Sequence, residues 1–449
     1  MFMPAKTIAV IGAGNRGEIY ASWAKKHPDR LRVVAVCDPD PVKRRRLADL
    51  HGIKDEFLFD DWRKLTEKRI ADAAVVATPD RTHFEIASGM LETGYPLLLE
   101  KPMGLTPDQC LSLVELADKK SLPVLVCHVL RYTNLFHKIE ELIREGSIGR
   151  VQSVYHAEEI AAFHMAHSYV RGRWGRVKDS SPIVLAKCSH DLDLLRVFAG
   201  ARARKIFSTG GLRHFTSQAM PEGAADQCTD GCIHEKNCPH FAPDLYLTAR
   251  PIKTMLASSP RFFVRQLARG FLNFPRAARL VGLGRIVDWR GWPVSTITEN
   301  LTEEGILQAL REGPYGRCVY KCENDQPDHQ NTIIEYENGS SGVLAFHGFA
   351  ALESRRTRVT GDEGTIRALF GSDTHLEIIS PENKLIRRFR LPGGLFGHDE
   401  GDMAIVKHFV EVLGGSSPLT SARESLESHL TAFAAYESMR TGKPVSLPS

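Results

Sequence analysis

Two residues of this sequence stand out for their chemistry, a lysine at position 101 and a histidine at position 190. Oxidation of a carbinol requires a base for the hydroxyl proton and a cation that stabilises the developing alkoxide. A histidine titrates near neutral pH, so His190 suits the base, and Lys101, at the end of an apolar segment, suits the cation. We predict both as catalytic. The alternative for His190 is a histidine at the start of a helix whose ring hydrogen-bonds to the backbone. The alternative for Lys101 is a surface lysine before a proline turn.

A glycine-rich turn at residues 12–17, G-A-G-N-R-G, follows an apolar segment that reads as a strand. Gly12 permits the tight turn, Gly14 lets the backbone approach a pyrophosphate, and Gly17 lets the next helix pack on the strand. The first amides of that helix then face the phosphates. We therefore predict a dinucleotide site that includes Asn15 and Arg16.

The second apolar segment, residues 31–37, ends on Asp38. A carboxylate about 20 residues beyond the glycines is placed to accept hydrogen bonds from a ribose 2′-hydroxyl, which favours NAD over NADP. Arg44, Arg45 and Arg46 keep NADP open as an alternative, since an arginine near this acid could meet a 2′-phosphate. A solvent-exposed helix face explains these three arginines better than a 2′-phosphate site does.

Short apolar segments alternate with helical patterns up to about residue 125, which predicts an α/β, doubly wound parallel sheet with its ligand at the carboxyl ends of the strands. The predicted elements include strands at 73–77 and 96–99 and a helix at 84–92. Beyond residue 150, strands at 151–156, 331–337 and 342–349 predict an α+β domain with an open, mainly antiparallel sheet. We place the domains at 1–125 and 126–449, with an insertion at about 212–300.

The bulk composition is that of an ordinary globular enzyme: 43% hydrophobic and 25% charged residues. A net charge of +4 is no argument for a nucleic-acid partner. The sequence has no run of 18 apolar residues, and residues 1–6 lack a signal-peptide pattern, so we expect neither a membrane span nor secretion. Nine cysteines, an odd number, indicate reduced thiols and a cytoplasmic location.

Four motifs together resemble the Gfo/Idh/MocA oxidoreductases: the glycine turn, Thr78-Pro79 with His83 after it, Glu100-Lys101-Pro102, and His190-Asp191-Leu192-Asp193. The resemblance implies a Rossmann domain followed by an open-faced sheet domain, with a sugar or cyclitol oxidised or reduced between them. It adds Thr78, Pro79, His83, Glu100 and Lys101 to the expected cofactor site. We also expect a homo-oligomer that assembles through the open sheet face. The run at 187–191 and a cysteine-bearing insertion resemble a less characterised branch of that family.

One position departs from the pattern of this family. Many members carry an aspartate four residues before the histidine, on the same helical face, and here that position is Ala186. Lys187 either replaces this partner, and is then catalytic, or points to solvent. If Lys101, Lys187 and Arg171 all face the cleft, the site would suit a carboxylated sugar.

Further cleft candidates lie between the two domains. His128, Arg131 and Tyr132 follow the strand at 124–127, a position that in the family approaches the substrate, and His167, Tyr169, Arg171 and Trp174 crowd a short predicted loop. Asp191 completes the predicted substrate-binding set, and His398 and Asp402 are weaker candidates. Such density of aromatic and hydrogen-bonding groups fits a carbohydrate pocket. The alternative is a loop that packs on the domain interface.

Three cysteines of the insertion, Cys228, Cys232 and Cys238, have the spacing C-x3-C-x5-C. Three thiols so close suggest a structural zinc, which takes four ligands in a tetrahedron. The resemblance implies Cys318 as the fourth ligand, because the Gly316-Arg317-Cys318 motif accompanies such insertions in that branch of the family. His234, His240 and Cys322 are the alternatives. The competing interpretation is an ordinary loop whose reduced cysteines bind no metal.

Residues 251–290 are basic, with arginines interleaved among phenylalanines and leucines and few acids. Such a helix can lie on an anionic membrane or bind a partner. We favour a helix that packs its apolar face on this protein's own second domain, because three prolines break any long helix.

Two classes of activity remain open from the sequence. The first is a dehydrogenase that acts on a sugar, sugar-acid or cyclitol hydroxyl and releases its reduced cofactor. The second cleaves glycosides by oxidation, elimination and re-reduction with a retained NAD. Both would use the same residues.

Overall fold

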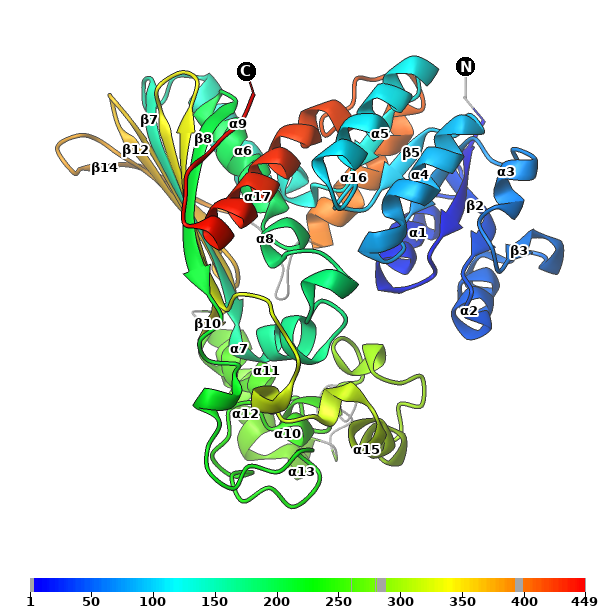
Figure 1. The fold of residues 1–449 in the computed structure, drawn as a ribbon, viewed down its shortest axis with the longest axis vertical. Helices are drawn as coiled ribbons and strands as arrows, with labels where there is room; N and C mark the ends of the chain where they lie inside the picture. The colour runs from blue at the N-terminus through cyan, green and yellow to red at the C-terminus, as the bar shows by residue number, and fades with distance from the viewer. Residues whose placement is uncertain (1–3, 260, 279, 281–287, 392–398, 449) are drawn as a thin grey trace.

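Two β-sheets organise the computed structural model, which describes residues 4–259, 261–278, 280, 288–391 and 399–448. The first sheet has six strands in the order β3-β2-β1-β4-β5-β6, and the second has nine in the order β14-β13-β12-β11-β7-β10-β9-β8-β15. The two sheets lie side by side, and the helices of the insertion lie below the second one (Figure 1).

All strand pairs of the first sheet are parallel, as the sequence predicts. The strands are β1 (Lys6–Ile11), β2 (Leu31–Cys37), β3 (Leu58–Phe59), β4 (Ala73–Val76), β5 (Leu97–Leu99) and β6 (Val124–Val126). The helices around them include α1 (Asn15–Lys26), α2 (Pro41–His51), α4 (His83–Glu92) and α5 (Pro107–Lys120). Every residue of β4, β5 and β6 is buried, because helices cover both faces of a parallel sheet.

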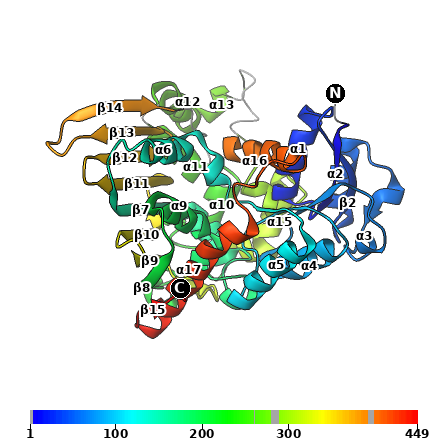
Figure 2. The same ribbon diagram turned by 90° about the horizontal axis from the view of Figure 1, so that it is seen from above.

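The second sheet is mainly antiparallel, with one parallel pair, β7 and β10. Its strands are β7 (Val151–Ala161), β8 (Ala203–Gly211), β9 (His329–Tyr336), β10 (Ser341–Ala350), β11 (Ser354–Gly361), β12 (Thr365–Phe370), β13 (His375–Ile379), β14 (Leu385–Arg390) and β15 (Val445–Ser446). Helices α6 (Asn134–Arg144), α9 (Ser189–Ala199) and α17 (Ala422–Thr441) line one face, and the other face is open (Figure 2). The predicted open sheet is confirmed.

The end of the chain returns to the first sheet. Helix α16 (Asp399–Val412) contributes Ile405 and Phe409 to the same core as Tyr20, and Leu426 of α17 packs into the core beneath α5. Residues far beyond position 126 therefore help to hold the first sheet, because side chains of these two helices share its hydrophobic cores.

The insertion has a small core of its own, which includes Tyr246, Ile252, Ile306 and Leu310 and contacts Phe163. Its helices are α10 (Ala242–Tyr246), α11 (Arg250–Ala257), α12 (Phe262–Asn273), α13 (Pro275–Ala278) and α15 (Glu303–Glu312). This core extends beyond residue 300.

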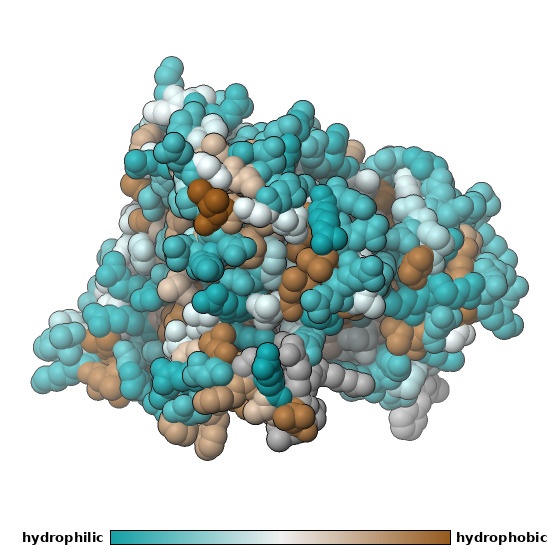
Figure 3. All heavy atoms as spheres, turned by 90° about the horizontal axis from the view of Figure 1, so that it is seen from below, coloured by the Kyte–Doolittle hydropathy of each residue, from teal (hydrophilic) through white to brown (hydrophobic). Residues whose placement is uncertain are grey.

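The two main helices of the basic segment differ in packing: Ile252 of α11 lies in the same core as Phe163, whereas α12 is less covered. On α12 Ala268 and Phe271 are buried, whereas Phe263 is 86% exposed and Phe274, which follows the helix, is 68% exposed. The helix packs mainly against α11 and α13. Figure 3 views this end of the molecule, where hydrophobic residues lie at the surface among hydrophilic ones. Within the described residues, no helix is both long and apolar enough to cross a membrane.

Candidate active site

The glycine turn has the close contacts that its sequence predicts. Gly12 has a φ of +93°, and a Cβ there would lie 2.5 Å from the carbonyl oxygen of Ala77. A Cβ on Gly17 would lie 2.0 Å from the carbonyl oxygen of Gly12, so only glycine lets α1 approach the turn. Above Gly14 the space is open, and no side chain caps the first turn of α1. This turn therefore fits a dinucleotide pyrophosphate at the helix N-terminus, beside the exposed Asn15.

Asp38 lies at the carboxyl end of β2, next to this turn. One of its carboxylate oxygens accepts a hydrogen bond from the Ala13 amide (2.7 Å), and the other accepts one from the Asp40 amide (2.9 Å). A carboxylate can accept about four hydrogen bonds, so capacity remains for a ribose hydroxyl. Arg44 donates to the Asp38 carbonyl, and Arg45 and Arg46 pair with surface acids. The arginines thus have partners in the protein.

Arg16 and Glu100, both predicted in the cofactor site, form an ion pair with each other. The Arg16 Nε lies 2.6 Å from a Glu100 oxygen, and its guanidinium lies 2.6 Å from Asp402. The Tyr20 hydroxyl donates to the same Glu100 oxygen at 2.6 Å and also contacts Arg16. Burial alone would raise the pKa of Glu100, but Arg16 and Lys101 hold it below its ordinary value. This network joins β5, α1 and α16 behind the glycine turn.

His83 connects the ends of two neighbouring strands. Its Nε2 lies 2.7 Å from the Thr78 carbonyl oxygen, and its Nδ1 lies 2.8 Å from the Pro102 carbonyl oxygen. The ring is buried between these oxygens and so holds the two strand ends together. Thr78 is half-exposed and Pro79 is exposed at the end of β4, where the sequence predicts them.

Lys101 follows β5 and reaches from the first domain to the second. Its Nζ donates to the Ala186 carbonyl oxygen at 2.6 Å, at the end of α8 (Ile183–Ala186). Burial lowers the pKa of Lys101, and the charges of Arg16 and Lys187 act in the same direction. The position that carries aspartate in many relatives thus meets Lys101 through its backbone.

His190 is buried on the first turn of α9, and its ring lies edge-on to the His128 ring, 5.6 Å between centroids. His128 in turn lies 5.7 Å from His429. Burial lowers the pKa of His128 and of His429 to about 3, so both are neutral at physiological pH. His190 therefore adjoins the neutral ring of His128.

The structure contains a buried charged cluster on β7, β11 and α9 that the sequence did not predict. Arg355 lies 2.7 Å from both Glu158 and Asp191, and Asp191 also lies 2.9 Å from His156. Burial raises the pKa of Glu158, whereas Arg355 and His156 hold the pKa of Asp191 below its ordinary value against the effect of burial. The negative charge of Asp191 also raises the pKa of Glu158, because like charges close together disfavour each other. Asp191 is thus fully buried in this cluster, not exposed to a ligand.

Lys187 extends from the same cluster. Its Nζ lies 3.4 Å from Glu158 and 3.7 Å from Glu353. The ammonium is therefore paired with acids rather than pointing to open solvent, and these acids offset its positive charge.

The remaining substrate candidates have partners inside the protein. Arg131 lies 3.5 Å from Asp193, and the Tyr132 hydroxyl lies 3.1 Å from that of Thr420. The Trp174 indole lies 3.2 Å from Asp80, to which Ser181 also donates at 2.7 Å. Asp80 directly follows Thr78-Pro79, so this contact fastens the second domain beside Lys101.

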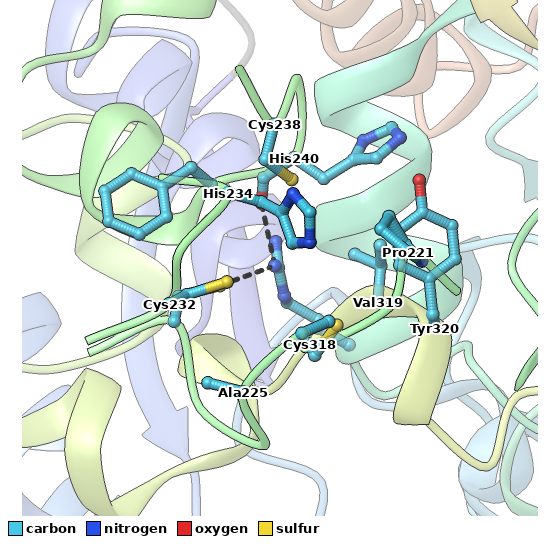
Figure 4. Close-up of a pocket in the computed structure, with 13 residues that line it drawn as sticks. Pro221, Ala225, Cys232, His234, Cys238, His240, Cys318, Val319 and Tyr320 are labelled. Atoms are coloured by element: carbon cyan, nitrogen blue, oxygen red, sulfur yellow. Dashed lines mark hydrogen bonds between the residues drawn. The ribbon is translucent and has the colours of Figure 1, made fainter. Parts of the chain in front are cut away.

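His167, Tyr169 and Arg171 belong to a segment (Ala166–Arg171) that is wholly buried. His167 lies 2.8 Å from the Tyr246 hydroxyl in the insertion core, and burial lowers its pKa to about 3. Arg171 lines a pocket together with four cysteines and donates to the Cys228 sulfur, so it does not join Lys101 as the cationic interpretation required. Three of these cysteines are labelled in Figure 4. The interface alternative fits these residues better. His398 lies outside the described residues.

The four predicted metal ligands gather at this pocket: Cys228, Cys232, Cys238 and Cys318. All nine cysteines of the chain are free. Among the described residues, no three His, Cys, Asp or Glu side chains are already arranged to hold a metal ion.

Models of two protein-family domains match the chain. Residues 6–128 match "Oxidoreductase family, NAD-binding Rossmann fold", and residues 313–447 match "Oxidoreductase family, C-terminal alpha/beta domain". The chain belongs to the Gfo/Idh/MocA family. Its insertion falls between the two matched regions.

Among curated Gfo/Idh/MocA relatives, the putative oxidoreductase YteT of Bacillus subtilis is 27% identical over 252 residues, 53% of this chain and 57% of that protein. Inositol 2-dehydrogenase 1 of Saccharopolyspora erythraea is 34% identical over 145 residues, 32% of this chain and 42% of the relative. The chain thus spans about half the length of these relatives.

Two solved structures share the fold over nearly the whole chain. The scyllo-inositol dehydrogenase of Lactobacillus casei superposes with a TM-score of 0.64 at 16% identity and 99% coverage of each chain. An oxidoreductase from Agrobacterium radiobacter, solved with NAD+, L-tartaric acid and magnesium, gives 0.65 at 14% identity and 98% coverage of each.

Proposed function

We propose that this protein is an NAD-dependent oxidoreductase that acts on a hydroxyl group of a sugar or cyclitol. The observation that carries the proposal is the reach of Lys101 from the end of β5 to the Ala186 carbonyl, at the edge where the glycine turn opens. Ligands of doubly wound sheets bind at this edge. The inositol dehydrogenases among the similar proteins support the substrate class.

Each side chain takes one role in this proposal. Lys101 donates a hydrogen bond to the reacting hydroxyl and stabilises its developing negative charge. His190 accepts the hydroxyl proton. Lys187 orients Glu158 and Glu353 and lowers the pKa of Lys101 through its charge. A bound nicotinamide cofactor supplies the hydride acceptor.

Incubation of the purified protein with a panel of sugars, sugar acids, inositols and nitrophenyl glycosides, with and without NAD, tests the function. Appearance of NADH that depends on one substrate group supports the proposal. Release of nitrophenol without net NADH would instead show glycoside cleavage and contradict it. A protein that binds NAD but turns over none of these compounds would contradict the proposed substrate class.

Asp38→Ala is expected to weaken NAD binding more than NADP binding. The substitution removes the acceptor for the ribose hydroxyl and also the charge that repels a 2′-phosphate. Titration calorimetry with both cofactors measures the two Kd values. Asp40→Ala is the matched control, because Asp40 caps α2 next to the same site. Equal losses for both cofactors would show that Asp38 does not select between them.

We propose that the open face of the second sheet joins copies of this chain. Phe207, Ile333, Val343 and Tyr155 are register partners across four neighbouring strands, and Ile333 is 53% exposed. An apolar row of this kind is typical of an interface. Ile333→Lys should therefore lower the molar mass measured by light scattering to that of a smaller assembly. Leu111→Lys, an exposed position on α5, should leave it unchanged. A monomeric wild type would refute the proposal.

A further inference from the structure

The backbone of the insertion brings Cys228 next to Cys318, 90 positions away in the chain. The Cys228 amide donates to the Gly316 carbonyl at 2.7 Å, and the Cys318 amide donates to the Asp226 carbonyl at 2.8 Å. These two bonds form a short antiparallel bridge centred on Gln227 and Arg317. The two cysteines are thus held at neighbouring places by the backbone, not by a chance approach of side chains.

Tight turns bring the other two cysteines to the same pocket. The Glu235 amide donates to the Cys232 carbonyl at 3.1 Å, and the Cys238 amide donates to the His234 carbonyl at 2.9 Å. Figure 4 shows Cys232, Cys238 and Cys318 around one opening. Four thiols from two distant segments therefore surround a common space.

A buried cation lies among these thiols. The Arg171 guanidinium is buried, and it donates to the carbonyls of Arg317 (2.7 Å) and His240 (2.8 Å) and to the Cys228 sulfur (3.5 Å). In the part of the chain that the structure describes, no carboxylate forms an ion pair with it. A buried charge without an opposite charge is costly. Thiolates around a metal ion would provide the missing negative charge.

We propose that Cys318 and the three cysteines of the insertion bind one structural zinc ion. Four thiolates in a tetrahedron are a typical closed zinc site, and their net negative charge would be balanced in part by Arg171. The backbone bridge holds Cys228 beside Cys318, so binding requires the four thiols to turn toward a common point.

The alternative ligands have other partners. The Cys322 thiol donates to the Cys318 carbonyl at 3.4 Å and does not line the pocket. The His234 Nε2 lies 2.7 Å from the Glu222 carbonyl oxygen, and the His240 Nε2 lies 3.1 Å from His214. These contacts favour the four-cysteine set. The site would anchor Arg171, and with it the segment that carries Trp174 to Asp80.

Elemental analysis of the untagged full-length protein tests the proposal. We expect about one zinc per chain, and a zinc-edge X-ray absorption spectrum with four sulfur neighbours at about 2.3 Å. Serine substitution at any of the four cysteines should lower bound zinc at least about tenfold and lower the Tm, because a closed site contributes folding free energy. Cys322→Ser is the matched control and should keep its zinc.

The absorption spectrum of the unmodified protein decides the matter even if a serine variant fails to fold. Protein purified without metal, iron in place of zinc, or zinc with nitrogen or oxygen neighbours would each overturn the four-thiolate zinc site. Zinc loss in Cys322→Ser equal to that in Cys318→Ser would overturn the assignment of Cys318.

Discussion

Lys101→Ala is expected to lower turnover by about two to four orders of magnitude while leaving the affinity for NAD nearly intact. The ammonium is the group that crosses from the first sheet to the Ala186 carbonyl, where the reacting hydroxyl is proposed to lie. Without the ammonium, the negative charge that develops on the reacting hydroxyl is less stabilised, and this charge is larger in the transition state than in the bound substrate. Steady-state kinetics with the substrate found in the panel, together with titration of NAD, measures both effects.

The pH profile gives a second readout for Lys101. Burial lowers its pKa below the ordinary lysine value of 10.5, so the cation is present at low pH and is lost as pH rises through the lowered pKa. Activity should therefore fall on the alkaline side before pH 10.5, and the residual activity of Lys101→Arg should lack this fall. Lys26→Ala, at an exposed position on α1, is the control. Activity that rises through the alkaline range would assign Lys101 the role of base instead.

His190→Asn is expected to lower turnover by about two to four orders of magnitude and to remove the acid limb of the pH profile. Asparagine preserves the size and a hydrogen-bonding group but cannot accept the proton from the hydroxyl. The neighbouring His128 cannot replace it, because burial lowers the pKa of His128 to about 3 and makes it a weak base. The rate should be measured across the acid range for both proteins.

The control for His190 is His137→Asn, an exposed histidine on α6. Its pH profile should match that of the wild type. An acid limb that survives in His190→Asn would show that another group accepts the proton, and the buried carboxyl of Glu158, whose pKa burial raises, would be the first to examine.

The first sheet and its glycine turn could be predicted from the sequence because both depend on local order. An apolar strand, a glycine turn and a helix are consecutive, and the steric need for Gly12 and Gly17 arises within a few residues or one neighbouring strand. The strand ends that carry Thr78 and Lys101 could be predicted for the same reason. Parallel strands bring their carboxyl ends to a common edge.

Roles that depend on distant segments could not be predicted. Arg16 was expected at the cofactor, but its partner Asp402 lies 386 positions away. The Arg355 that holds Glu158 and Asp191 comes from another strand of the second sheet. Pairing of this kind follows from strand register, and no spacing in the sequence encodes which strands become neighbours.

Arg171 shows most clearly what the sequence determines and what only the tertiary structure decides. The sequence determined its type and its place in a histidine-rich and aromatic segment, and this composition suits a carbohydrate pocket as well as a buried interface. The tertiary structure decided between them by turning the guanidinium toward the cysteines, where the carbonyls of Arg317 and His240 accept its hydrogen bonds. A long charged side chain takes the direction in which its donors find acceptors, and those acceptors lie on segments brought together only by the folded insertion.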